Sequence, residues 1–87
     1  MTISTPLRAI VRDVFIVPGR GCAIVLEKGF SGAARVGQVV KLGSQTVRVA
    51  AVQFVDTRSE SWVAIVVGEE HFALAKTHVG NEILEHR

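Results

Sequence analysis

The residues that most often perform chemistry are few in this chain of 87 residues, and the first of them is its single cysteine. Cys22 begins an apolar run that extends to Leu26, and no general base stands near it in the sequence to activate its thiol. Cys22 is therefore expected to be a small buried hydrophobic residue rather than a nucleophile. A single cysteine also excludes an intramolecular disulfide and implies no oxidising compartment.

Histidines and paired glutamates are the other candidates for chemistry. His71, His78 and His86 do not have the spacing of a closed zinc site, and no second cysteine supports one. Glu69 and Glu70 precede a short helical pattern, where carboxylates are stabilised by the helix N-terminus without catalysis. No pair of residues indicates general acid–base chemistry. The sequence therefore predicts a protein that is not an enzyme and has no metal or other cofactor.

A glycine-rich segment suggests a nucleotide loop at first sight. The run from Gly19 to Ile24 begins like a dinucleotide fingerprint, but Ile24 replaces the third glycine and no helix follows. Pro18 presets its own φ, and Gly19 can take the positive φ that the next position of a type II turn requires. Gly21 restores freedom to the chain after the turn. Pro18, Gly19 and Gly21 are predicted to form a structural turn, and no nucleotide is expected.

Most of the chain has the residue pattern of short β-strands. Apolar runs and alternation predict strands at residues 7–17, 22–27, 38–42, 45–55, 61–67 and 81–84. Breaking residues predict an irregular connection at 30–37, a tight turn at 43–44 and a polar loop at 56–59. The only helical pattern covers 71–76 and ends at Lys76. These elements predict one all-β domain at 7–84, a small barrel or sandwich, with tails at 1–6 and 85–87.

Alternation also predicts which side chains face inward. In the first strand the inward side chains are Leu7, Ala9 and Val11, opposite Arg8 and Arg12; beyond Asp13 both faces are apolar, as in a strand covered on both sides. In the strand 45–55 the predicted inward set is Val47, Val49, Ala51 and Val55, and the outward set is Thr46, Arg48, Ala50 and Val52.

The segment Val11-Arg-Asp-Val-Phe-Ile-Val-Pro-Gly-Arg-Gly21 resembles the opening of the second domain of translational GTPases such as elongation factor Tu. In that family Asp-Val-Phe precedes a Gly-Arg-Gly turn, and a strand then runs to a glycine, here Gly29. Later segments at 36–40, 47–54 and 80–84 are also similar, so the resemblance covers residues 7–84. It implies a closed six-stranded Greek-key β-barrel, which leaves no apolar strand edge exposed.

Two departures limit what this resemblance implies about activity. The segment Arg58-Ser-Glu-Ser-Trp-Val63 stands where the family has a glycine-rich start to its fifth strand, and these 87 residues contain no GTPase domain. The nucleotide switch of the family is therefore not expected. In the family the barrel packs on the GTPase domain and contacts RNA or ribosomal partners. Only the turn at Gly19, Arg20 and Gly21 matches closely enough to carry a role over.

Charge is distributed unevenly along the sequence. Residues 1–55 hold seven basic and two acidic side chains, a net charge of +5, whereas residues 56–87 hold three basic and six acidic ones, a net charge of −3. If the two parts lie on different sides of the molecule, the surface is dipolar and steers a partner. If their side chains intermix, no such field exists.

The candidate binding residues are four arginines that could neutralise phosphates, Arg8, Arg12, Arg20 and Arg48. Trp62 is a further candidate, as an interface anchor or a core residue at a barrel mouth.

Two function classes follow. The first is a non-catalytic binding module for a protein partner, including a second copy of the chain in a homodimer. The alternative is an RNA- or ribosome-associated accessory factor that uses the basic N-terminal half. A small hydrolase would need a pocket that joins Cys22 or a histidine to a carboxylate.

The N-terminus lacks a signal-peptide pattern and no apolar run approaches about 20 residues, so a cytoplasmic protein without membrane contact is expected.

Overall fold

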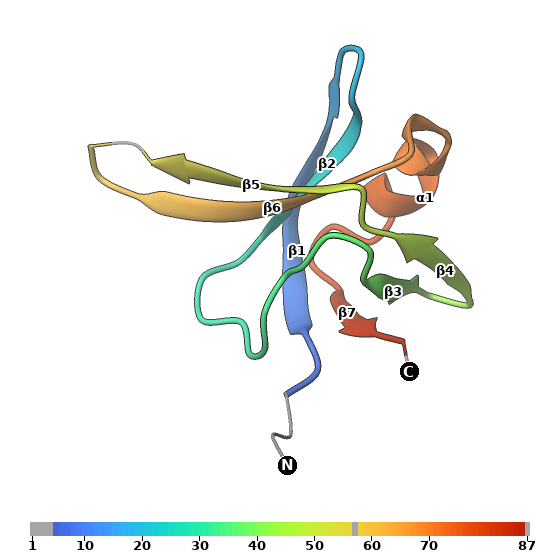
Figure 1. The fold of residues 1–87 in the computed structure, drawn as a ribbon, viewed down its shortest axis with the longest axis horizontal. Helices are drawn as coiled ribbons and strands as arrows, with labels where there is room; N and C mark the ends of the chain where they lie inside the picture. Colours follow the sequence, from blue (N-terminus) through green and yellow to red (C-terminus); the bar gives the residue numbers. More distant parts are fainter. Residues whose placement is uncertain (1–4, 57, 87) are drawn as a thin grey trace.

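A computed structural model describes residues 5–56 and 58–86, so the predicted tail residues 1–4 and 87, and residue 57 of the predicted polar loop, lie outside the described part. The described residues are mostly β-strand (Figure 1). The strands are β1 (Arg8–Val17), β2 (Gly21–Leu26), β3 (Val39–Leu42), β4 (Gln45–Arg48), β5 (Ala51–Asp56), β6 (Ser61–Val67) and β7 (Glu82–Glu85). A 3₁₀ turn, η1 (Glu69–His71), and a helix, α1 (Phe72–Lys76), connect β6 to β7. The predicted all-β class is confirmed.

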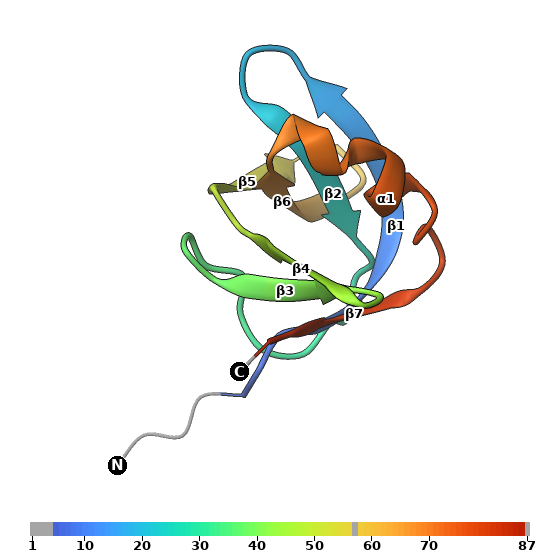
Figure 2. The same cartoon turned by 90° about the vertical axis from the view of Figure 1, so that its right-hand side faces the viewer.

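The strands form one series in the order β4-β3-β7-β1-β2-β6-β5, and the strands in each neighbouring pair are antiparallel. β1 is the central strand: Arg8–Ile10 pair with β7, and Val11–Val17 pair with β2. Because one long strand serves both sides, the sheet curls, and β3, β4 and β7 lie opposite β2, β5 and β6 (Figure 2). α1 lies at one end of the curled sheet, where Ala75 is buried.

A bulge in β1 changes which side chains face the core. The predicted inward residues Leu7, Ala9 and Val11 are at most 3% exposed, as expected. The register with β2 then shifts between Val11 and Asp13, so the inward parity moves by one residue and Val14 is buried. The prediction that both faces are covered beyond Asp13 is wrong for Phe15, which is 45% exposed on the opposite face from Val14.

The predicted strand 45–55 is two strands in the structure. The amide of Val49 donates to the carbonyl of Gln38 at 2.7 Å, beside β3, whereas the amide of Ala50 donates to the carbonyl of Val66 at 2.7 Å, in β6. The chain changes its pairing partner between these two residues. The predicted inward set therefore holds for Val47 and Val49 but is wrong for Val55, which is 42% exposed, while Val52 packs against the core. Because of this division, the described residues form seven strands in place of the predicted six.

The two ends of the strand series are β4 and β5, and these two strands do not pair with each other in the described part of the chain. A two-residue link, Val49–Ala50, joins them. The observed architecture is thus a strongly curled sheet, and the predicted closed barrel is not confirmed. Its interior holds one main cluster of buried aliphatic side chains, of which the largest are Leu7, Ile24, Leu26, Leu42, Ile65 and Ile83.

The shorter elements are close to their predicted positions. The turn at 43–44 and the irregular connection at 30–37 are present, and Ser31 forms a bridge with Arg8 within that connection. Helical structure begins at Glu69 rather than at residue 71 and ends at Lys76 as predicted. β7 extends to Glu85, a residue that the sequence assigned to the C-terminal tail. None of the helical segments in the described residues has the length and apolar character required to cross a bilayer.

Candidate interaction surface

The turn between β1 and β2 has the geometry of a type II turn. The amide of Arg20 donates to the carbonyl of Val17 at 3.0 Å, and Gly19 has φ of 76° at the third position. Gly21 has φ of 133°, and a Cβ atom there would overlap the carbonyl oxygen of Val67. Gly21 therefore permits the close approach of β2 to the end of β6. Arg20 is exposed in this turn.

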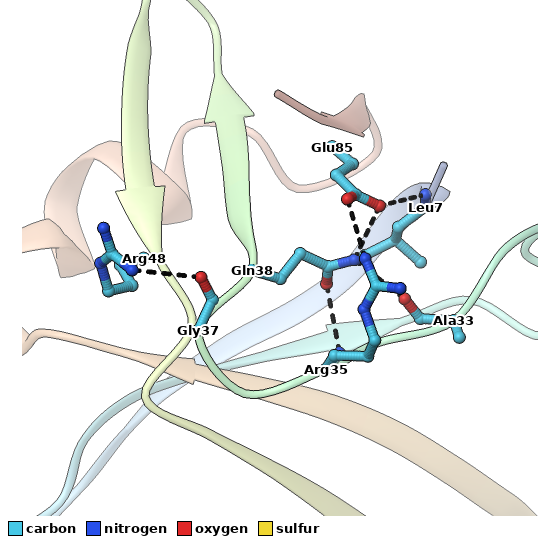
Figure 3. Close-up of polar contacts among 7 residues, drawn as sticks. All are labelled: Leu7, Ala33, Arg35, Gly37, Gln38, Arg48 and Glu85. Atoms are coloured by element: carbon cyan, nitrogen blue, oxygen red, sulfur yellow. Dashed lines mark hydrogen bonds and ion pairs between the residues drawn. The ribbon is translucent and has the colours of Figure 1, made fainter. Parts of the chain in front are cut away.

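The structure distributes the four predicted arginines over different elements. Arg8, near the start of β1, places Nε 2.7 Å from Oε2 of Glu82, and this hydrogen bond and charge raise the pKa of the guanidinium. Arg48, at the end of β4, donates from Nη1 to the carbonyl of Gly37 at 3.3 Å (Figure 3). Arg20 is at the opposite end of β1 from Arg8. These three arginines do not form one patch.

Arg12 and Trp62 are the pair of predicted binding residues that the structure brings together. The guanidinium carbon of Arg12, the extra residue in the β1 bulge, lies 4.4 Å from the centroid of the Trp62 ring. Trp62 Nε1 donates to Oε2 of Glu60 at 2.7 Å, and Arg12 Nη2 lies 3.9 Å from the same oxygen. The Trp62 ring therefore has one face under a cation and its polar atom satisfied by a carboxylate.

Trp62 belongs to a second apolar cluster that is separate from the main core. This cluster consists of buried Ala23, Val25 and Ala64, with Val17 and Trp62 packed against them. Its side chains alternate with the core residues of β1, β2 and β6, so they point away from the interior of the curled sheet. Trp62 is thus neither a main-core residue nor fully exposed. We call these five residues, together with Phe15 and Val55, the outer face.

Phe15 and Val55 extend the outer face to its two sides. Phe15 is the cross-strand neighbour of Ala23, and Val55 is the cross-strand neighbour of Trp62. Their exposed fractions are 45% and 42%. Residues from four neighbouring strands thereby combine into one apolar surface, and the sequence did not predict it because alternation alone suggested that β1 was covered on both sides.

The β5–β6 hairpin projects away from the body of the protein (Figure 1). On its core-side face, Phe54 is 74% exposed and is the cross-strand neighbour of Val63. Phe54 and Val63 border a cavity of about 260 Å³ whose other walls are Phe30, Gly32, Ala33 and Ala34. The hairpin therefore presents apolar side chains on both of its faces.

A polar network that the sequence did not reveal ties three distant segments together (Figure 3). Glu85 Oε1 accepts hydrogen bonds from the Leu7 amide at 3.0 Å and from Gln38 Nε2 at 2.9 Å, while Arg35 Nη2 lies 3.0 Å from Oε2. Gln38 Nε2 also donates to the carbonyl of Ala33 at 2.9 Å, and Gln38 Oε1 accepts from the Arg35 amide at 3.3 Å. Gln38 is 6% exposed, so these bonds satisfy a buried amide. No local pattern links residues 38 and 85.

The candidates for chemistry occupy separate environments. Cys22 is fully buried in β2, and burial raises the pKa of its thiol. His78 Nδ1 lies 2.9 Å from the carbonyl of Leu74, and His71 Nε2 lies 3.5 Å from Oε1 of Glu70. Among residues 5–56 and 58–86, no three histidine, cysteine, aspartate or glutamate side chains are grouped so that they could hold a metal ion.

Ion pairs show how the two oppositely charged parts of the sequence meet. Arg8 pairs with Glu82, Arg35 with Glu85 and Arg12 with Glu60, so basic side chains of the first part contact carboxylates of the second. Lys76 of the second part lies 3.5 Å from Asp13 of the first. At these positions the charges are intermixed, which favours the interpretation that the surface has no dipolar field to steer a partner.

Comparison of the chain with family models, with curated proteins and with solved structures found no match. The resemblance of residues 11–21 to translational GTPases therefore stays a prediction.

Proposed function

We propose that this protein is a non-catalytic binding module that holds a protein partner on its outer face. The observation that carries the proposal is the apolar surface formed by Phe15, Val17, Val55 and Trp62 over the buried residues of the second cluster. Apolar and aromatic side chains gathered on one face are typical of protein interfaces, where tryptophan and arginine are the most frequent energetic anchors. The Arg12–Trp62 stack places both residue types at the edge of this surface.

We further propose that the curled sheet is a closed six-stranded Greek-key barrel like the second domain of translational GTPases. In this barrel β4 and β5 are two halves of one strand, and the edge of β5 that faces away from β6 stays unpaired in the described part of the chain. The hydrogen bonds on either side of the link, from Val49 to Gln38 and from Ala50 to Val66, support this interpretation. We place the module in the cytoplasm, since its single cysteine implies no oxidising compartment.

The alternative, an RNA- or ribosome-associated factor, has less support. Binding to phosphates requires basic side chains that are free to contact them. Arg8 and Arg35 already contact carboxylates, and one face of the Trp62 ring is occupied by Arg12. An RNA partner would have to separate these pairs before it gained contacts of its own.

Site-specific photo-crosslinking in cells tests the proposal. A photoreactive residue at Phe15 samples the outer face, and one at Val79 is a matched control, since the two positions are 45% and 41% exposed. The expected result is a defined adduct with another protein at position 15 and none at position 79. The purified protein, treated in the same way, identifies adducts between two copies of the chain. If position 15 gives no adduct with another protein above the control, the proposal is wrong.

A further inference from the structure

β5 is the last strand of the sheet, and one of its edges has no neighbour. It pairs with β6 over all six residues, Ala51–Asp56, and with no other strand in the part of the chain that the structure describes. The N–H and C=O groups along such an edge are a template for a further strand. The side chains of Phe54 and Val55, which point to the two faces of this strand, are 74% and 42% exposed.

The two ends of the sheet differ in how their edges are protected. Proteins discourage pairing at an edge with short strands, charges, prolines or bulges. β4 follows this rule, because it has four residues, of which Gln45, Thr46 and Arg48 are exposed and polar. β5 has the sequence Ala-Val-Gln-Phe-Val-Asp, which contains no proline or basic residue, and it pairs with β6 without a register shift. β5 therefore has none of these protections except a single carboxylate at its end.

We propose that β5 pairs antiparallel with β5 of a second copy of this chain, around a two-fold axis perpendicular to the sheet, so that one continuous sheet crosses the dimer. Antiparallel pairing of identical strands is self-complementary, which is the requirement for a two-fold interface. Such an axis keeps both outer faces on the same side. Val55 and Trp62 of the two copies then form one larger apolar surface, and this inference rests on the proposed binding function of that surface.

Charge favours a second copy as the occupant. Asp56 is the only charged residue of β5 and stands at its end, so antiparallel pairing moves the two Asp56 carboxylates to opposite ends of the ladder. Antiparallel pairing therefore separates the two like charges, whereas parallel pairing would place them together.

The dimer also accounts for the exposure of Phe54. On the core-side face, the added strand places its own apolar side chains beside Phe54, next to the cavity that Phe54 borders. An aromatic side chain that is 74% exposed in the single chain is thereby covered on the side of the free edge.

Sedimentation equilibrium of the purified protein tests the inference. The wild type is expected to be a dimer, and Phe54→Lys is expected to weaken association by about tenfold or more, since it sets like charges close together across the ladder. The control Val79→Lys changes a side chain that is 41% exposed elsewhere and should leave association unchanged. A wild type that stays monomeric at millimolar concentration overturns the dimer, as does a dimer that Phe54→Lys does not weaken.

Cysteine crosslinking tests the geometry independently of any loss of folding. Gln53 and Phe54 are the two central residues of β5, so one of them faces its own copy near the axis. Directly opposed residues have Cα atoms about 4.5–5.5 Å apart, within the reach of a disulfide. Oxidation should link Gln53→Cys or Phe54→Cys into a covalent dimer but not Val79→Cys, and the absence of both links overturns this pairing. A monomer that still forms an adduct with another protein at position 15 would refute the dimer and retain the proposed function.

Discussion

Gly21 shows how a single residue sets the distance between two strands. Its φ of 133° is a conformation that other residues rarely adopt, and a Cβ atom would overlap the carbonyl oxygen of Val67. Gly19, two residues earlier, also has a positive φ, 76°, but no atom lies within 4 Å of the position of its Cβ. Glycine is thus required at position 19 by the backbone conformation alone. At position 21 it is required by the backbone conformation and by packing.

Alanine substitutions separate these two causes. Gly21→Ala should lower the free energy of unfolding by about 3 kcal/mol, because backbone strain is combined with steric overlap. Gly19→Ala should cost about 1 kcal/mol, the strain of a left-handed residue alone. Urea denaturation of both variants measures the difference. Equal losses would contradict the close approach of β2 to β6.

The buried thiol of Cys22 predicts a loss of stability at alkaline pH. Burial raises its pKa above the ordinary value of 9.0, so the folded chain holds the thiol proton more tightly than the unfolded chain does. This contribution is fully present below pH 9.0 and declines as pH rises toward the folded pKa, by about 1.4 kcal/mol per pH unit. The unfolding free energies of wild type and Cys22→Ala are measured from pH 7 to pH 10. The difference between them should stay constant below pH 9.0 and decrease above it. A difference that stays constant over the whole range would contradict this contribution of the buried thiol.

At the scale of elements, the Glu85 carboxylate joins β7 to the start of β1 and to the 30–37 connection. It accepts hydrogen bonds from the Leu7 amide and from Gln38, and it pairs with Arg35. Its side chain is 11% exposed, whereas that of Glu82 in the same strand is 41% exposed and pairs with an exposed arginine. Each glutamate pairs with an arginine, but Glu85 does so in a largely buried position and Glu82 in an exposed one.

Removing each carboxylate compares what Glu85 and Glu82 contribute to stability. Glu85→Ala should lower the free energy of unfolding by about 2 kcal/mol or more, because the buried amide of Gln38 loses an acceptor. Glu82→Ala should have a much smaller effect, since exposed ion pairs contribute little to stability. Thermal or urea unfolding of both variants is the measurement. A loss for Glu82→Ala as large as that for Glu85→Ala would contradict the role of the network.

The strands themselves were largely predictable, because alternation is a local property of the sequence. The bulge in β1 was not, since no glycine or proline marks Arg12 as an extra residue. The change of partner after Val49 was not predictable either, because residues 49–52 are all apolar and alternation does not mark where the parity changes. Both irregularities arise from how the strand fits its neighbours, and both reverse the parity of the side chains that follow.

For the whole molecule, the intermixed charges bear on the choice between a protein partner and RNA. Net charge along the sequence suggested a basic half, but Arg8, Arg12 and Arg35 each lie within 4 Å of a carboxylate of the acidic part. A folded surface of this kind has a weaker field than the sequence halves have separately.

We therefore expect only non-specific affinity for RNA, with a dissociation constant of about 1 μM or weaker at physiological salt. Fluorescence anisotropy with a structured RNA over a series of salt concentrations measures it. Arg8→Glu combined with Arg12→Glu should leave the affinity in this range. Nanomolar binding that this double variant abolishes would favour the RNA-associated alternative.

The sequence by itself determined the all-β class, the approximate strands, the turn after Val17 and the burial of Cys22, because these depend on local alternation and on backbone preferences. Only the tertiary structure decided that Arg12 stacks on Trp62, that Glu85 satisfies Gln38, that the outer face is partly exposed, and that β5 pairs with β6 alone among the described strands. These features depend on contacts between residues far apart in the chain, and local patterns carry no information about which distant strands become neighbours.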